Sequence, residues 1–199
     1  MTGGQMDSSF IDTLEKNISA QTPRAIEIPA DTLQAAVMAI LKNGRGGVEL
    51  CFIKRSVHPL DRFSGHMAFP GGIRETNDRD ILATAVRETR EEIGLNIEKN
   101  AKIAGRLDDE MPRPAPADKT GRSYVVTPFV CALTASGADK AATHDRGEVE
   151  QVFWMPVGEL KKADGGSLSP ESSPEFFCRE QRIWGMTARI VDNLLKFLP

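Results

Sequence analysis

Cysteine is scarce in this sequence, and the few that occur form no pattern. Cys51, Cys131 and Cys178 are far apart, and none belongs to a closely spaced pair of the kind that binds a metal. A small, odd number of scattered cysteines argues against a disulfide framework and is typical of a reducing compartment. Cys51 and Cys131 fall in apolar segments, where a free cysteine behaves as a small hydrophobic residue. We therefore expect a cytoplasmic protein.

Long apolar runs and basic clusters are also missing. No run approaches the roughly 18 residues of a membrane span, and the N-terminus has no basic segment leading into an apolar core. The formal net charge is −3, and no stripe of basic residues is interleaved with aromatic ones. These absences predict a protein with neither a membrane nor a nucleic acid as its partner.

The rest of the composition is globular, with 40% hydrophobic and 27% charged residues. A chain of 199 residues is long enough for one domain with a sizeable core. We expect a tail and a short helix over residues 1–30 and a single domain over residues 31–199, with residues 1–6 disordered. Ser8 or Ser9 would cap the helix. Its apolar residues recur at helical spacing: Phe10, Leu14 and Ile18.

Strand patterns alternate with a few helical ones over the remaining chain. Residues 33–41 and 48–53 read as two strands joined by a glycine-rich turn. A buried terminal helix is predicted over residues 184–198. Further strands are predicted at residues 67–69, 103–107, 124–133 and 149–155. This order favours an α/β/α sandwich around a mixed β-sheet.

The most informative stretch joins a tight turn to a helix with an acidic end. Phe69-Pro70-Gly71-Gly72 forms the turn, and its glycines can bring backbone groups close to a metal or a phosphate. The helix is predicted over residues 80–93, with Asp78 and Asp80 near its start and Gly94 as its C-cap. Its buried stripe would hold Leu82, Val86, Thr89 and Ile93. Its acidic residues share one flank of that stripe: Glu88, Glu91 and Glu92.

Three carboxylates at this end of a helix break a local rule. A helix C-terminus carries roughly half a negative charge, so Glu91 and Glu92 are each disfavoured there by a few tenths of a kcal/mol. Mutual repulsion should also raise the pKa of at least one of them. A hard divalent cation, Mg²⁺ or Mn²⁺, would make the arrangement favourable and could link it to a substrate phosphate. The alternative is a solvated helix face with ion pairs, such as Arg87 with Glu91 at i+4.

The run from Gly72 to Arg87-Glu88-Thr89-Arg90-Glu91-Glu92-Ile93-Gly94-Leu95 resembles the Nudix box. That pattern is Gly, five residues, Glu, seven residues, then Arg-Glu-U-x-Glu-Glu-x-Gly-U, where U is aliphatic. Here Thr89 occupies an aliphatic position, Asp78 replaces the early Glu, and one extra residue precedes Arg87. The coenzyme A pyrophosphatase branch shares the last two departures. It also has Phe-Pro-Gly-Gly, an Arg-Ser pair like Arg55-Ser56, and a C-terminal run like residues 183–189.

The resemblance implies a Nudix fold and a Mg²⁺- or Mn²⁺-dependent hydrolase that cleaves the diphosphate linkage of a nucleoside diphosphate derivative. By position, Glu88, Glu91 and Glu92 would bind the metal, Gly72 would lend its backbone, and Arg87 would hold the glutamates. Asp78 would be structural. A further catalytic acid often comes from a late loop in this family. Glu148 is the candidate for that acid, and a solvated loop residue is the alternative.

The branch implies coenzyme A or its acyl esters as the substrate, with ADP-ribose, nucleotide sugars or dinucleotides as alternatives. A Nudix-fold nucleotide sensor without turnover is the non-enzyme alternative. Substrate contacts are expected from Arg55, Arg62, Gly71 and Gly72, although five residues separate Ser56 from Arg62 where the branch has three. Dimers are frequent in the family, so a homodimer is allowed.

Three further residues have two interpretations each. His58 and His66 would contact phosphate or simply be solvated loop residues. Trp184 would stack on a base or belong to the core.

Overall fold

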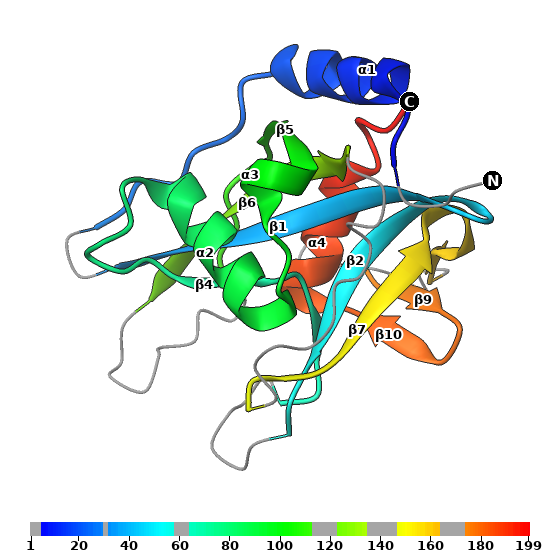
Figure 1. Cartoon of the computed structure of the whole chain (residues 1–199). Coiled ribbons are helices and arrows are strands. Elements are labelled where there is room, and N and C mark those ends of the chain that lie inside the picture. Colours follow the sequence, from blue (N-terminus) through cyan, green and yellow to red (C-terminus); the bar gives the residue numbers. More distant parts are fainter. Residues whose placement is uncertain (1–4, 30–31, 58–63, 113–122, 135–146, 164–173) are drawn as a thin grey trace.

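In the computed structural model of the chain, a mixed β-sheet lies between two helical layers (Figure 1). The structure describes residues 5–29, 32–57, 64–112, 123–134, 147–163 and 174–199. Its elements in chain order are α1 (Ser8–Ser19), β1 (Leu33–Gly44), β2 (Gly47–Arg55), β3 (Met67–Ala68), β4 (Gly71–Ile73), α2 (Ile81–Ile93), α3 (Ile97–Asn100), β5 (Ala101–Arg106), β6 (Tyr124–Leu133), β7 (Val149–Pro156), the 3-10 turn η1 (Val157–Glu159), β8 (Lys161–Lys162), β9 (Phe176–Cys178), β10 (Gln181–Ile183) and α4 (Gly185–Leu194).

The main sheet forks at its centre. β1 pairs with β6 in parallel along its length, and it pairs with β2 only over residues 41–44, next to their shared turn. Farther from that turn, the short β4 takes the position beside β1, at residues 35–37. The far end of β2 pairs instead with β3, while β7 runs along β2 and β5 along β6. The predicted mixed sheet is thus confirmed, and the fork brings the turn between β3 and β4 beside β1.

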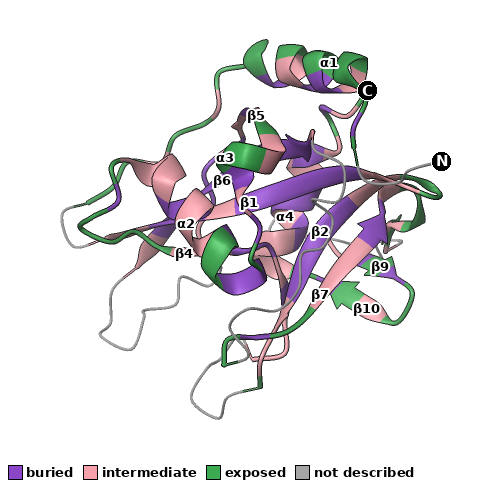
Figure 2. Ribbon diagram, in the orientation of Figure 1, coloured by how far each residue is buried: buried purple, intermediate pink, exposed green. Residues whose placement is uncertain are grey.

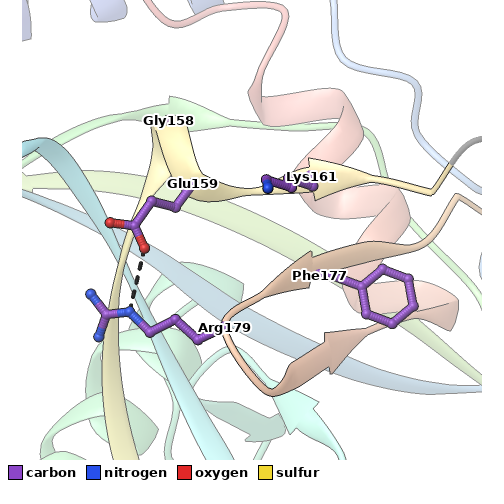
Figure 3. Close-up of a pocket in the computed structure, with 5 residues that line it drawn as sticks. All are labelled: Gly158, Glu159, Lys161, Phe177 and Arg179. Atoms are coloured by element: carbon purple, nitrogen blue, oxygen red, sulfur yellow. Dashed lines mark hydrogen bonds and ion pairs between the residues drawn. The ribbon is translucent and has the colours of Figure 1, made fainter.

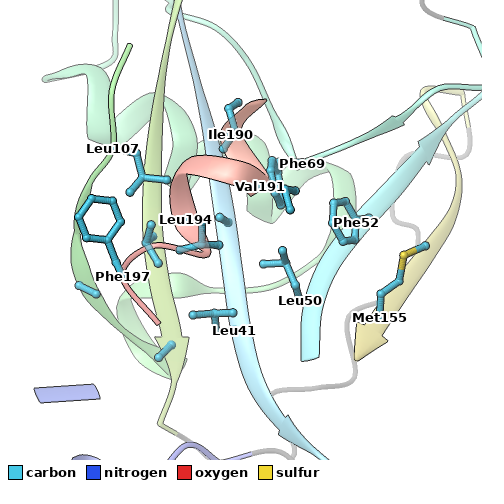
Figure 4. Packing of buried hydrophobic residues seen from close by; sticks show 14 of the residues in the cluster. Leu41, Leu50, Phe52, Phe69, Leu107, Met155, Ile190, Val191, Leu194 and Phe197 are labelled. Atoms are coloured by element: carbon cyan, nitrogen blue, oxygen red, sulfur yellow. The ribbon is translucent and has the colours of Figure 1, made fainter. Parts of the chain in front are cut away.

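Separate apolar cores lie on the two faces of the sheet. The central strands of the sheet are largely buried (Figure 2). Because side chains alternate along a strand, Leu41 and Phe52 face one layer while Ile40 and Ile53 face the other. On the first face, helices α1 and α4 cover the sheet. Figure 4 shows α4 packing on it through Ile190, Val191 and Leu194. On the second, α2 and α3 cover it. This arrangement confirms the predicted α/β/α sandwich.

The N-terminal helix begins one or two residues earlier than the predicted N-cap, Ser8 or Ser9, implies. Asp7 is its N-cap, and the Asp7 carboxylate accepts the backbone N–H of Ser9 at 2.7 Å. Met6 is buried and donates its N–H to the Leu133 carbonyl at 2.8 Å, so residue 6 does not belong to a disordered start. Ile11 takes the buried position that was expected for Phe10, which is half-buried. Ile11 shares the buried face of the helix with Leu14 and Ile18, and Phe10 packs at the edge of that face.

The buried face of α2 also differs from the predicted stripe. Leu82 and Val86 are only half-buried, while Thr84 and Ala85 are buried together with Thr89 and Ile93. The rotation has one consequence for function, since it places Glu92 on the buried face as well.

A small second sheet, β8–β9–β10, was missed by the strand patterns because its strands have two or three residues each. Its buried face, Phe176 and Ile183, packs in the same core as α4. The three cysteines are buried and free, as expected of structural thiols. No helix in the described part of the chain is long and apolar enough to cross a membrane.

Candidate active site

Both ends of α2 are fixed by local chemistry. At its start, the Asp80 carboxylate accepts the backbone N–H of Ala83 at 2.8 Å. At its end, Gly94 adopts the left-handed conformation (φ 68°) that helix C-caps favour. The three glutamates therefore lie in the last two turns of the helix, opposite the turn between β3 and β4.

Glu92 is the most buried of the three, with 3% of its surface exposed. Its Oε2 atom accepts the backbone N–H of Gly71 at 2.9 Å, which ties the helix to the start of β4. The pKa of Glu92 is raised to about 8, mainly by burial and also by the charges of Glu88 and Glu148, whereas the Gly71 N–H and Arg55 oppose the shift. The raised pKa was predicted, but its main cause is desolvation rather than repulsion between the glutamates.

Glu88 lies directly against Gly72. A Cβ atom at position 72 would overlap the Glu88 carboxylate, so only glycine lets this side chain approach the backbone of β4. At Gly71 the neighbour is main chain, because a Cβ there would overlap the Ala36 carbonyl oxygen of β1. Partial burial raises the pKa of Glu88 as well. Gly71 and Gly72 thus allow β4 to lie between β1 and the carboxylates of Glu88 and Glu92.

Glu91 is the outermost carboxylate, with 57% of its side chain exposed. Arg87 joins it to Glu88, since the Nη1 atom of Arg87 donates to Glu88 Oε1 and to Glu91 Oε2, both at 3.0 Å. The predicted i, i+4 pair is confirmed. One arginine therefore orients two of the three glutamates.

Asp78 holds Arg87 in turn, a contact that the sequence did not reveal. The Nε and Nη2 atoms of Arg87 donate to the two oxygens of Asp78, each at 3.0 Å. Asp78 Oδ2 also accepts the Thr84 hydroxyl and the Glu75 N–H, both at 2.9 Å. Arg87 holds the pKa of this carboxyl well below its usual range, and Asp78 raises the pKa of Arg87. Asp80, not Asp78, is the helix N-cap, so Asp78 acts through the arginine.

Two residues from other elements lie near these carboxylates. Glu148 is exposed in the turn before β7, and its negative charge raises the pKa of both Glu88 and Glu92. Its carbonyl accepts the Ser56 N–H at 2.8 Å, just beyond β2. Arg55 ends β2 and lowers the pKa of Glu92. The structure therefore brings these two predicted site residues toward α2.

The remaining predicted contacts divide into two groups. Arg62 and His58 lie outside the described residues. His66 and Trp184 lie together, with their ring centroids 4.6 Å apart. Trp184 is 42% exposed, which excludes the core interpretation.

The carboxylates of α2 fit a hard cation by their chemistry. Arg87 occupies one oxygen each of Glu88 and Glu91, and Gly71 occupies one oxygen of Glu92. The second oxygen of each accepts no hydrogen bond from the described residues. In the described ranges, however, no three acidic, histidine or cysteine side chains converge closely enough to hold a metal ion as they stand. The donor set suits Mg²⁺ or Mn²⁺, while the convergence is incomplete in this conformation.

A separate cavity of about 350 Å³ opens beside the small sheet (Figure 3). An ion pair between Glu159 and Arg179, 3.3 Å apart, crosses its wall. Among the described residues it is lined by Gly158, Glu159, Lys161, Phe177 and Arg179, and no predicted site residue in these ranges is one of them.

The fold and this site have counterparts among known proteins. A model of the NUDIX domain matches residues 32–176. The chain therefore belongs to the Nudix family and is a Nudix hydrolase, a pyrophosphohydrolase of a family that typically uses divalent metals.

Two relatives and one solved structure show which individual proteins the chain resembles. The chain is 31% identical over 173 residues to the mitochondrial coenzyme A diphosphatase NUDT8 of Mus musculus, covering 82% of this chain and 77% of that one. It is also 31% identical over 143 residues to the uncharacterized Nudix hydrolase NudL of Photorhabdus laumondii, covering 68% and 70%. Among solved structures, a MutT/nudix family protein from Enterococcus faecalis matches with a TM-score of 0.53 at 14% identity, over 94% of this chain and 74% of that one.

Proposed function

We propose that this Nudix hydrolase cleaves the diphosphate linkage of coenzyme A or its acyl esters. The observation that carries the hydrolytic part is the buried Glu92 carboxylate, which Gly71 holds beside Glu88 at the end of α2. The coenzyme A part is supported by the similarity to a coenzyme A diphosphatase and by the sequence features shared with that branch. ADP-ribose, nucleotide sugars and dinucleotides are the alternative substrates.

In this proposal the glutamates of α2 hold the metal. Glu88, Glu91 and Glu92 would each offer the oxygen that Arg87 or Gly71 leaves unused, and Gly72 would offer its backbone carbonyl. When bound, Mg²⁺ or Mn²⁺ would neutralise the diphosphate and polarise its phosphorus. A carboxylate with a pKa near 8 binds its proton at neutral pH, so cation binding would release that proton.

The residues around the metal site would then position substrate and water. Arg55 would balance the charge of the diphosphate, and the Gly71 N–H of β4 already donates to Glu92 at this site. Glu148 would accept a proton from the attacking water as that oxygen bonds to phosphorus. The bridging P–O bond then breaks, and its electron pair leaves with the second phosphate. The products are an adenosine 3′,5′-bisphosphate and a 4′-phosphopantetheine.

A panel of coenzyme A, acetyl-coenzyme A, ADP-ribose, a nucleotide sugar and a dinucleoside polyphosphate tests the substrate. The products should be identified by mass in the presence of Mg²⁺ and, separately, of Mn²⁺. We expect the highest kcat/KM with coenzyme A or its acyl ester, giving the two products above. A higher kcat/KM for any other member of the panel would replace the proposed substrate.

Substitution of Glu92 tests the site itself. Glu92→Gln keeps the shape of the protonated side chain, so the fold should persist while kcat falls by at least about 100-fold. Glu98→Gln is the matched control, because Glu98 is an exposed glutamate of α3 outside the proposed site. Hydrolysis by Glu92→Gln at the wild-type rate would refute the assignment. Nucleotide binding without any product by the wild-type protein would instead support a sensor.

Three earlier expectations stay predictions: the reducing, cytoplasmic compartment, the homodimer, and the division of the chain at residue 30. The substrate contact of Arg62 also stays a prediction.

A further inference from the structure

Trp184 is an exposed aromatic residue at an unusual place. It is the N-cap of α4, where small polar residues are preferred, and its side chain makes no capping hydrogen bond. With 42% of its surface exposed, the indole also contributes little to the core. A large aromatic side chain at this position exposes apolar surface and leaves the helix start without a side-chain cap. Both effects are unfavourable for stability, which indicates a functional role for the residue.

Two side chains surround the indole. The His66 ring lies 4.6 Å from it, centroid to centroid, at an angle of 60°. The guanidinium carbon of Arg182 lies 5.5 Å from the centre of the indole ring. Arg182 is itself paired with Glu175 through two contacts of 3.0 and 2.6 Å. Its charge is therefore largely balanced, and the surface formed by Trp184, His66 and Arg182 is better suited to a flat ring than to an additional phosphate.

This surface is connected to the proposed active site through one hairpin. The His66 carbonyl accepts the N–H of Arg55 at 3.1 Å, and Arg55 is the last residue of β2. Along the chain, His66 and Gly71 are five residues apart, which limits their Cα atoms to about 18 Å. Trp184 and the Gly71 amide that holds Glu92 are thus linked by one short stretch of chain, and our proposal takes the nucleoside end of the substrate to extend along it.

We propose that Trp184 is the stacking surface for the nucleobase of the substrate. The proposal rests on the proposed function, because it takes a nucleoside diphosphate derivative as the ligand. Every base has a flat π-face, so a stack on indole binds the ring without reading its hydrogen-bonding edge. Trp184 therefore contributes affinity for the nucleoside half of the substrate, and it makes no contribution to the base-free half.

Kinetics of Trp184→Ala and Trp184→Phe test this proposal with coenzyme A. Loss of one base–aromatic stack should raise KM at least about fivefold in Trp184→Ala, with kcat within twofold of wild type. Trp184→Phe retains a ring and should restore most of the affinity. Phe177→Ala is the matched control, since Phe177 is a similarly exposed aromatic residue, 41% exposed, in β9 of the small sheet, whose last strand β10 ends one residue before Trp184 (Figure 3). An unchanged KM in Trp184→Ala, or an equal rise in Phe177→Ala, would overturn the proposal.

Calorimetry separates this proposal from the proposed function. The Glu92→Gln protein is titrated with adenosine 3′,5′-bisphosphate, with ADP and with base-free 4′-phosphopantetheine, with and without Trp184→Ala. We expect Trp184→Ala to weaken the binding of both adenine compounds by the same factor and to leave the affinity for 4′-phosphopantetheine unchanged. ADP binding that depends on Trp184 would support the stack even if the wild-type protein failed to hydrolyse coenzyme A. The stacking proposal would be refuted if Trp184→Ala weakened the binding of 4′-phosphopantetheine equally, or if it did not weaken the binding of ADP.

Discussion

The guanidinium of Arg87 binds the carboxylate of Asp78 through two parallel hydrogen bonds of 3.0 Å each. The same arginine contacts two of the proposed metal ligands, Glu88 and Glu91. It also donates to the Ile73 carbonyl of β4 at 3.2 Å, so it connects the helix, the turn before it and the strand that carries Gly72. Asp78 thereby determines the geometry of a site whose ligands it does not touch.

Removal of Asp78 should destabilise the fold. Asp78→Ala would leave Arg87 and Thr84 without their main partner in a mostly buried position. We expect a loss of about 2–3 kcal/mol in the free energy of unfolding, somewhat below the roughly 3–5 kcal/mol typical of a fully buried pair. Urea denaturation measures it. Glu75→Gln is the control, because Glu75 is exposed and lies 3.9 Å from Arg87, and its effect should stay within about 0.5 kcal/mol. Equal effects of the two variants would contradict this role.

The same carboxyl predicts a dependence of stability on pH. The pKa of Asp78 is lower in the folded chain than in the unfolded one, so the unfolded state binds the proton first as the pH falls. The stabilisation by Asp78 is thus complete above about pH 5 and fades as the pH drops below the ordinary aspartate pKa of about 3.9. The difference in unfolding free energy between wild type and Asp78→Asn should shrink between about pH 5 and pH 3. A difference that stays constant across this range would refute the assignment.

Divalent cations should stabilise the folded protein. A cation that binds only the folded state raises stability by RT ln(1 + [L]/Kd), about 2.7 kcal/mol at one hundred times Kd. For a chain of this size each kcal/mol corresponds to about 2–4 °C in Tm. We expect millimolar Mg²⁺ or Mn²⁺ to raise the Tm of the wild type and of Glu98→Gln, and to have a much smaller effect on a Glu88→Gln/Glu92→Gln double variant. Identical shifts in all three proteins would place the cation elsewhere.

Substitutions of the two glycines of β4 should have different effects. At Gly71 a methyl group meets the main chain of Ala36, so Gly71→Ala should cost roughly 2 kcal/mol or more. At Gly72 it meets the flexible end of Glu88, so Gly72→Ala should displace that carboxylate and lower activity more than stability. Gly46→Ala is the control, since a Cβ there meets nothing within 4 Å. Thermal unfolding and steady-state kinetics on the three variants separate these effects.

The N-terminal helix should be an integral part of the fold. Leu14 is fully buried in the core shared by α1, the sheet and α4. Leu14→Ala should therefore cost about 2–5 kcal/mol, like other large-to-small changes in cores. Ile28→Ala removes an exposed side chain of the same segment and should be nearly neutral. A neutral Leu14→Ala would show that residues 1–30 are a dispensable appendage.

Local patterns were enough for the elements that have strong periodicity or clear end signals. Three of these features depend only on residues close in sequence. They are the helix that ends at Gly94, the two strands paired across the turn at residues 45–46, and the ion pair between Arg87 and Glu91. The small sheet was missed because strands of two or three residues have no detectable period. The rotation of α2 was misjudged because the fold buries Thr84 beside Asp78 and Ala85 in the core against the sheet, and no helical pattern specifies these contacts.

The sequence by itself determined the family, the donor chemistry of the site and the helix on which that chemistry lies, since all of these reside in one continuous stretch of residues. Only the tertiary structure decided that Glu92 is buried against Gly71, that Asp78 holds Arg87, and that Trp184 lies exposed beside His66. The physical reason is that burial and long-range contacts depend on how β1 and β2 diverge to admit β4, and on how the helical layers pack on that forked sheet.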